Sequence, residues 1–212
     1  MLDIIAHRGV WNENHEKNSV GAFKKALENG FGIETDLRDF NGNIVISHDI
    51  PSKTCITFKE FMGIVQEYPS QTLALNIKSD GLQHLIKNNL SIDTQYFFFD
   101  MSVPDTLGYA KNDLEFFTRY SDIEPYPSLV NDATGIWVDN FSSNILDIDA
   151  VVRFLDLNKK IVLVSPELHG FEYNVYWEQL LKYLKQNPCK AKYVGLCTDK
   201  PFNAREYFSH AN

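Results

Sequence analysis

Residues 6–49 read AHRGVWNENHEKNSVGAFKKALENGFGIETDLRDFNGNIVISHD, and this stretch decides the fold. Apolar segments at 2–6 and 31–37 have the length and composition of buried strands, and each ends in polar residues. Between them an amphipathic pattern predicts a helix that Ser19 caps and that Asn29-Gly30 ends. Asn41-Gly42 is a strong hairpin signal, so residues 44–46 should form a strand that returns toward His48.

The rest of the chain repeats the alternation of strand and helix. Strands are predicted at 72–77, 96–99, 114–118, 135–138, 160–164 and 193–197, and helices at 58–68, 81–88, 103–111, 148–157, 176–185 and 203–208. About eight strand–helix units are expected of a parallel (β/α)8 TIM barrel. An open, doubly wound sheet is the alternative. No linker interrupts the pattern, so a single domain over 1–212 is expected.

Composition narrows the class of protein. The chain is 44% hydrophobic, enough for a large core, and its formal net charge of −8 argues against binding nucleic acid. Three scattered cysteines do not form a disulfide framework. The first residues do not resemble a signal peptide, and no apolar run approaches the ~20 residues that span a bilayer. A soluble cytoplasmic protein in a reducing compartment is expected, of unknown oligomeric state.

Polar side chains gather where the predicted strands end, and one pair stands out. Glu34 and Asp36 are two residues apart, so both lie on one face of a strand. Two carboxylates this close repel each other unless a cation or a proton lies between them. A metal site is one solution, and a bridge from Lys78 or Arg38 is the other.

Two histidines and an arginine lie in the same stretch. His7 and His48 each end a predicted strand, and Arg8 follows His7. Histidine exchanges protons near neutral pH, arginine binds phosphate through a planar fork, and carboxylate oxygens hold hard cations. The set suits phosphoryl chemistry, since breaking a phosphodiester needs one group to accept a proton and one to donate it.

These motifs resemble the glycerophosphodiester phosphodiesterase family. The matching residues, in family order, are His7-Arg8-Gly9, Lys17-Asn18-Ser19, Glu34-Thr35-Asp36, Asn41-Gly42, His48-Asp49, Asn76-Ile77-Lys78 and the closing Thr198-Asp199-Lys200-Pro201. The resemblance is specific in the N-terminal half and weaker in the middle. It implies a barrel enzyme that hydrolyses a small, lipid-derived or polymeric phosphodiester with the help of one divalent cation.

The resemblance also implies roles for individual residues. Glu34 and Asp36 would bind the cation, His7 and His48 would form the acid–base pair, and Arg8 and Lys78 would hold phosphate. Asn76 stands where the family has a third metal-binding glutamate. Its carbonyl oxygen still suits Mg2+ or Ca2+, but the lost charge predicts weak binding.

Two further departures concern the site's surroundings. Lys17 replaces a glutamate at the helix start, which predicts a change in the support around His7. Only about nine residues separate His48-Asp49 from the helix predicted at 58, so the capping insert common in the family should be missing.

Two alternatives stay open. One is a metal-independent, phospholipase-C-like lyase, with Arg119 supplying positive charge to the substrate in place of the metal. The other is a non-catalytic barrel that binds phosphorylated polyols, which is favoured by Asn76 in place of the family's glutamate. If Asn76 is not a ligand, Asp139 or Glu167 is the next candidate.

Overall fold

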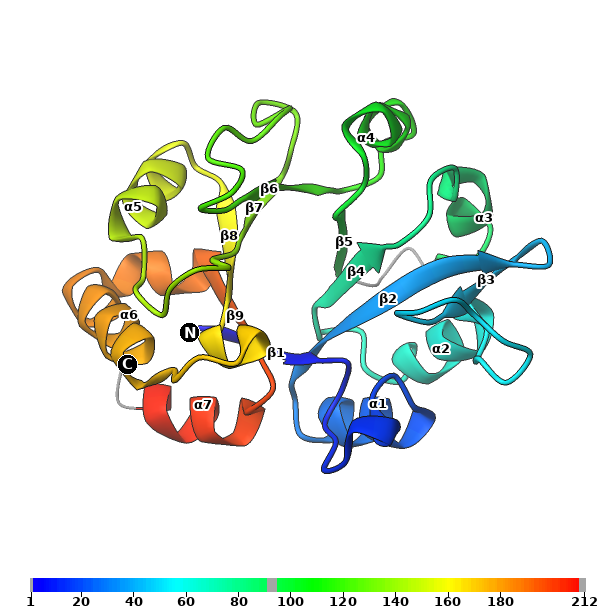
Figure 1. Ribbon diagram of the computed structural model, residues 1–212, viewed down its shortest axis with the longest axis horizontal. Helices are drawn as coiled ribbons and strands as arrows, with labels where there is room; N and C mark the ends of the chain where they lie inside the picture. The colour runs from blue at the N-terminus through cyan, green and yellow to red at the C-terminus, as the bar shows by residue number, and fades with distance from the viewer. Residues whose placement is uncertain (1, 91–94, 210–212) are drawn as a thin grey trace. The chain divides into compact units, whose positions relative to one another are not determined.

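The computed structural model describes residues 2–90 and 95–209 (Figure 1). Their contacts divide the chain into two compact units. The N-terminal unit holds residues 5–116, and the C-terminal unit holds residues 2–4 and 117–209. The expectation of one domain over 1–212 stays a prediction.

The N-terminal unit is built on parallel strands with one antiparallel addition. Its strands are residues 5–7 of β1 (Asp3–His7), β2 (Gly32–Phe40), β3 (Asn43–Ile46), β4 (Leu73–Ile77) and β5 (Tyr96–Phe99), in the order β5-β4-β2-β1. β3 pairs antiparallel with β2 through the hairpin at Asn41 (φ 50°) and Gly42 (φ 79°). Two positive φ angles in a two-residue turn match the twist of the flanking strands, so the hairpin prediction is confirmed.

Helices α1 (Val20–Glu28), α2 (Phe58–Val65), α3 (Gln83–Lys87) and α4 (Val103–Lys111) follow these strands, and a short 3-10 helix, η1 (Asn14–Glu16), precedes α1 (Figure 1). The Ser19 side chain accepts the Ala22 N–H and caps α1 as predicted. The buried rings of Phe23 and Phe61 meet edge to face with centroids 4.8 Å apart, which joins α1 to α2. α1 is therefore anchored at its first turn and along its buried face.

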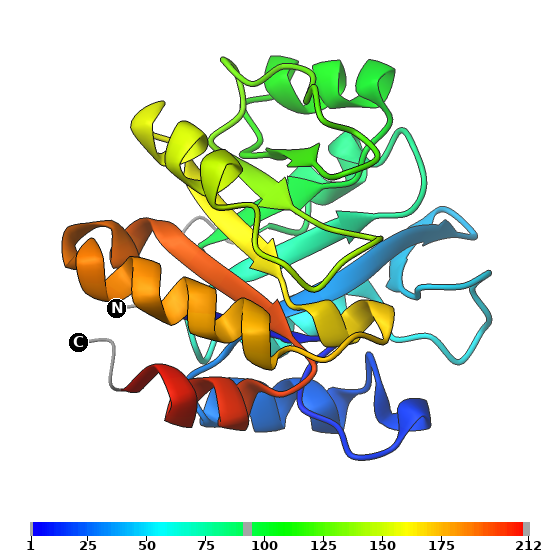
Figure 2. The ribbon, with the colours of Figure 1, turned by 60° about the vertical axis from the view of Figure 1, so that its left-hand side comes forward.

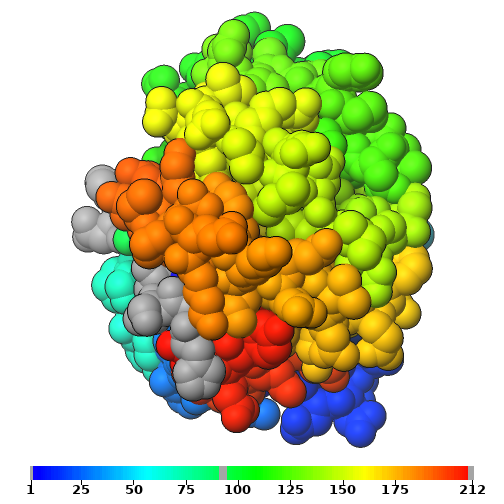
Figure 3. Space-filling model, turned by 90° about the vertical axis from the view of Figure 1, so that its left-hand side faces the viewer, coloured from blue at the N-terminus to red at the C-terminus, as the bar shows by residue number. Residues whose placement is uncertain are grey.

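The C-terminal unit continues the parallel pattern. Its strands are β6 (Phe117–Tyr120), β7 (Gly135–Val138), β8 (Lys160–Val164) and β9 (Val194–Thr198), paired in the order β9-β8-β7-β6. Helices α5 (Ile148–Asp156), α6 (Asn174–Gln186) and α7 (Pro201–Phe208) flank these strands (Figure 2), and the orange α6 and red α7 share one surface (Figure 3). Their buried faces form one core, which includes Ile136, Phe154, Leu163, Trp177, Leu180 and Leu196.

The order of elements is predicted correctly, and the errors are local. The strand predicted at 114–118 is misplaced, because the observed β6 covers Phe117–Tyr120. Phe116 forms an isolated bridge to Phe98 and lies outside the strand. The 3-10 helices η1, η2 (Pro166–His169) and η3 (Pro188–Tyr193) were not predicted, since turns this short have no hydrophobic period. No large insert separates β3 from α2. Within the described parts of the chain, no helix is long and apolar enough to cross a bilayer.

Candidate active site

Strand register in the N-terminal unit brings four predicted site residues to neighbouring positions. His7 is the partner of Glu34 across β1 and β2, and Asp36 is the partner of Asn76 across β2 and β4. Glu34 and Asp36 share a face of β2 because side chains alternate along a strand. The four side chains thus come together at the carboxyl ends of three parallel strands.

Asp36 is the most heavily contacted member of this cluster. It is fully buried, at 0% exposure. Its Oδ2 lies 3.1 Å from Arg8 Nε and accepts a 2.9 Å hydrogen bond from Asn18 Nδ2, while its Oδ1 lies 3.5 Å from Lys78 Nζ. A buried carboxylate needs such partners, because an isolated charge in this setting is very costly.

Glu34 makes weaker contacts than Asp36. It is 2% exposed, its Oε2 lies 3.8 Å from His7 Nε2, and the Asn76 amide donates a hydrogen bond to its carboxylate. Burial, followed by the negative charge of Asp36, raises the pKa of Glu34 well above its usual value, and the positive charges of Arg8 and Lys78 only partly oppose this. This environment therefore favours the protonated form of Glu34 more than water does.

Three oxygens of this cluster are suited to a cation. Glu34 Oε2, Asp36 Oδ1 and Asn76 Oδ1 are all buried and accept no hydrogen bond. Such atoms are rare in folded proteins and point to a missing partner, such as an ion or water. Carboxylate and amide oxygens are the donors that Mg2+ and Ca2+ prefer, so the residues present fit a hard divalent cation.

The possible metal ligands nonetheless carry little negative charge. Across the described ranges, no group of three or more His, Cys, Asp and Glu side chains is arranged to hold a metal ion. A cation here would rely on two carboxylates and one neutral amide. The alternative to a metal was a bridge from Lys78 or Arg38 between the two carboxylates. Lys78 contacts Asp36, as does Arg8, whereas Arg38 donates to the His48 carbonyl at 3.1 Å.

His48 lies two residues after the end of β3. The neighbouring Ser47 N–H donates to the Asp36 carbonyl at 3.0 Å, which holds this backbone beside β2. The imidazole is 45% exposed, and its Nδ1 lies 2.9 Å from Asp49 Oδ1. The hydrogen bond and charge of His48 lower the pKa of Asp49. The structure thus holds the residue before His48 against Asp36 but pairs the His48 ring with Asp49.

The turn after β1 explains why glycine follows His7-Arg8. Arg8 and Gly9 both have positive φ, at 58° and 84°. A Cβ on Gly9 would lie 2.7 Å from the Ala22 carbonyl carbon, so α1 approaches the turn too closely for any side chain. Gly9 therefore lets the chain pass between the strand end and α1 while Arg8 turns toward Asp36.

Asn18 is a site residue whose role the sequence did not reveal. It appeared only as part of a helix-start motif, yet its side chain donates to Asp36 and accepts a 2.8 Å hydrogen bond from Thr35 Oγ1. Its φ of 58° is in the left-handed region that asparagine tolerates. An asparagine before the N-cap serine was the one available signal.

The C-terminal unit holds the other predicted residues. Arg119 forms an ion pair with Glu124 through Nη2 at 2.9 Å. Asp139 Oδ1 lies 2.7 Å from His169 Nε2, and this hydrogen bond raises the pKa of His169. Glu167 accepts hydrogen bonds from the Asp199 N–H at 3.1 Å and from the hydroxyls of Ser165 and Thr198. Arg119, Asp139 and Glu167 thus each have a partner in their own unit.

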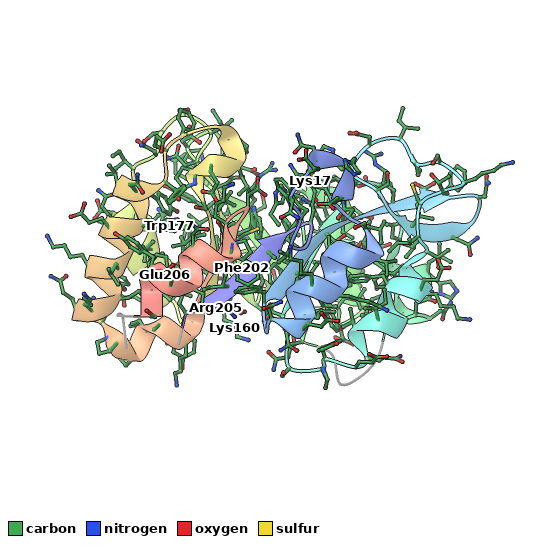
Figure 4. All side chains as sticks on the ribbon, turned by 90° about the horizontal axis from the view of Figure 1, so that it is seen from below. Lys17, Lys160, Trp177, Phe202, Arg205 and Glu206 are labelled. Carbon is green, nitrogen blue, oxygen red and sulfur yellow. The ribbon has the colours of Figure 1, made fainter. Side chains whose placement is uncertain are left out.

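A groove between α6 and α7 contains none of the predicted site residues. Its lining mixes the aromatic side chains of Tyr173, Trp177 and Tyr207 with polar and charged ones such as Asn203, Lys185 and Glu206. Figure 4 labels Trp177 and Glu206 at this place. It brings together no acid–base pair or carboxylate pair, so it is not the place where the predicted chemistry is assembled.

Solved structures of similar fold cover the whole chain. A glycerophosphodiester phosphodiesterase from Agrobacterium tumefaciens str. C58 matches with a TM-score of 0.70 at 14% identity, over 99% of this chain and 100% of its own. The fold is a TIM barrel. A second, from Parabacteroides distasonis, matches with a TM-score of 0.67 at 15% identity, over 100% of this chain and 98% of its own. The predicted eight-stranded parallel barrel without a large insert is confirmed.

The same fold occurs with different chemistry. A 7,8-dihydropteroate synthase from Vibrio fischeri ES114 matches with a TM-score of 0.58 at 8% identity, over 99% of this chain and 92% of its own. No protein-family model and no curated protein sequence matches the chain. Because one barrel supports many reactions, the function has to be argued from the site.

Proposed function

We propose that this protein is a divalent-cation-dependent phosphodiesterase that hydrolyses a glycerophosphodiester or a related polyol phosphodiester. The observation that carries the proposal is the buried cluster at the ends of β1, β2 and β4. It combines two adjacent carboxylates, three oxygens without hydrogen bonds, a histidine and two cationic side chains. The TIM-barrel fold supports it, since active sites of such barrels lie at the carboxyl ends of the strands.

Glu34, Asp36 and Asn76 would hold the cation. When bound, a divalent cation stabilises negative charge on the phosphoryl oxygens. A positive charge among these oxygens would also favour the ionised form of Glu34. The cation is expected to bind weakly and exchange readily, since Asn76 adds a dipole and no charge.

The chain's own residues would supply binding and proton transfer. Arg8 and Lys78 carry the positive charges beside Asp36 that would bind phosphate. His7, oriented by Glu34, and His48, oriented by Asp49, would act as the acid–base pair. One accepts the proton of the attacking water or hydroxyl, and the other protonates the leaving alkoxide.

A metal-independent lyase is the second candidate, and the charges of the cluster favour it. Arg8 and Lys78 both contact Asp36, and their positive charges also act on Glu34, so two cations offset two carboxylates. In this reaction a neighbouring hydroxyl of the substrate attacks phosphorus, the bond to the leaving alcohol breaks as that alcohol takes up a proton, and a cyclic phosphodiester forms first. Phosphorus NMR of the products distinguishes it from direct hydrolysis.

The test is turnover of bis(p-nitrophenyl) phosphate and of glycerophosphodiesters with Mg2+, Ca2+ or Mn2+, repeated in EDTA. Activity that needs the cation supports the proposal. Activity on glycerophosphodiesters that survives EDTA supports the lyase, whereas bis(p-nitrophenyl) phosphate carries no neighbouring hydroxyl and reports only on direct hydrolysis. No turnover of any diester, together with measurable binding of glycerol phosphate, would identify a non-catalytic binder and overturn both.

Histidine substitutions test the assignment of roles. His7→Ala and His48→Ala should each lower kcat by roughly 10²–10⁴-fold, the usual effect of losing a general acid or base. The control is His84→Ala, an exposed histidine in α3, which should leave kcat unchanged. A variant at position 7 or 48 with the kcat of the unaltered protein would remove that histidine from the mechanism.

A further inference from the structure

The loop at residues 8–18, between β1 and α1, closes on itself beside the candidate site. Arg8 and Asn18 stand at its two ends, each with a φ of 58°, and the Asn18 N–H donates to the Arg8 carbonyl at 3.0 Å. Within it, Glu16 Oε2 accepts the N–H groups of Asn12 at 2.7 Å and Glu13 at 3.0 Å. It is a compact loop with adjacent ends and internal hydrogen bonds, a type that is frequently functional.

This loop fixes the peptide that joins His7 to Arg8. The Trp11 indole N–H donates to the His7 carbonyl at 3.0 Å, and the Arg8 N–H of the same peptide donates to the Glu34 carbonyl at 2.9 Å. Both polar groups of one peptide plane are thereby held from different directions. Since a peptide is planar, its orientation constrains the direction in which the His7 and Arg8 side chains leave the backbone.

Lys17 in turn packs on Trp11. Its Nζ lies 4.2 Å from the centroid of the indole ring, close enough for a cation–π interaction, and Figure 4 labels Lys17 on the loop before α1. Lys17 stands where the resembling family has glutamate. In this chain its ammonium group therefore contacts the indole that holds the His7 carbonyl.

We propose that Trp11 is a positioning residue for His7 and Arg8, and that Lys17 supports it through the face of the indole. The inference deepens the proposed function and rests on it for its kinetic readout. Trp11 acts on the reaction through the backbone, so its removal should displace the imidazole and the guanidinium without removing either group. Misplaced catalytic groups lower kcat more than they weaken ground-state binding.

The experiment compares Trp11→Phe with Trp177→Phe. Trp11→Phe keeps an aromatic ring under Lys17 but removes the N–H donor. It should lower kcat roughly 10- to 100-fold, with a smaller rise in KM because Arg8 also binds phosphate. Trp177→Phe removes an indole N–H that donates to Ser165 Oγ at 2.8 Å in the C-terminal unit. It should lower stability while leaving kcat and KM unchanged.

A second pair tests the support from Lys17. Lys17→Met removes the charge over Trp11 and should lower kcat in the same direction by a smaller factor. Lys192→Met is its control, because Lys192 Nζ lies 4.9 Å from the Tyr193 ring centroid in the C-terminal unit. This control should leave kcat unchanged.

NMR separates failure of this inference from failure of the proposed function. Imidazole cross-peaks, recorded without substrate at one fixed pH, should shift for His7 in Trp11→Phe and stay in place in Trp177→Phe. Unmoved His7 cross-peaks, or an unchanged kcat in folded Trp11→Phe, would overturn the positioning role. Shifted cross-peaks in a protein that turns over no diester would retain the role and overturn only the phosphodiesterase.

Discussion

Replacing Gly9 by alanine should destabilise the protein far more than the same change at Gly30. Both glycines have positive φ, 84° and 75°, so an alanine at either position is strained. At Gly9 the new Cβ would also lie 2.7 Å from the Ala22 carbonyl carbon and 2.8 Å from its oxygen, whereas nothing lies within 4 Å at Gly30. The two variants therefore differ chiefly in the clash with α1.

The magnitude follows from these two contributions. An alanine held in the left-handed region costs about 1–2 kcal/mol at either glycine. Forcing extra atoms into packed surroundings adds about 1–3 kcal/mol at Gly9. α1 cannot move away cheaply, because Phe23 is fully buried against Phe61 and the Val10 N–H donates to the Ala22 carbonyl at 2.9 Å. Gly9→Ala should thus cost about 2–5 kcal/mol in total.

Urea unfolding measures this difference. Circular dichroism and tryptophan fluorescence should give coincident transitions, and the midpoint of Gly9→Ala should lie below that of Gly30→Ala by on the order of 1 M. Replacing glycine by alanine also lowers the conformational entropy of the unfolded chain, but this stabilising effect is the same in both variants and cancels in the comparison. Equal midpoints would refute the reasoning, because they would mean that α1 does not approach the turn as closely as the structure places it.

Two further predictions concern the buried cluster. The pKa of Glu34 is raised in the folded state, so above the usual glutamate value of about 4.3 the folded protein binds more protons than the unfolded one and stability falls as pH rises. In EDTA, Glu34→Gln should flatten this decline, measured as urea midpoints at a series of pH values above the usual glutamate pKa, and an unaltered slope would contradict the burial argument. Asn76→Glu should tighten binding of Mg2+ and Ca2+ in calorimetric titration, because a third carboxylate beside Asp36 adds charge to the ligand set. Exposed Asn88→Glu is its control, and unchanged or weaker binding in Asn76→Glu would show that Asn76 does not face the cation.

The sequence by itself determined the order of elements and the local turns. Apolar runs with strand length, helical periodicity and the Asn41-Gly42 turn are local signals, and they predicted the alternation that the barrel requires. The i, i+2 spacing of Glu34 and Asp36 is equally local, since alternation along a strand puts both on one face. The Ser19 cap was predictable because its partner, the Ala22 N–H, is three residues away.

Only the tertiary structure decided which distant residues meet. Asn18 reaches Asp36 across 18 positions, and Lys78 reaches the same carboxylate from β4, because parallel strands align their carboxyl ends. Between Trp11 and the His7 carbonyl that it contacts, Arg8 and Gly9 both have left-handed backbone angles, which no hydrophobic period encodes. The raised pKa of Glu34 needs burial, which arises only when the surrounding strands and helices exclude water from the carboxylate.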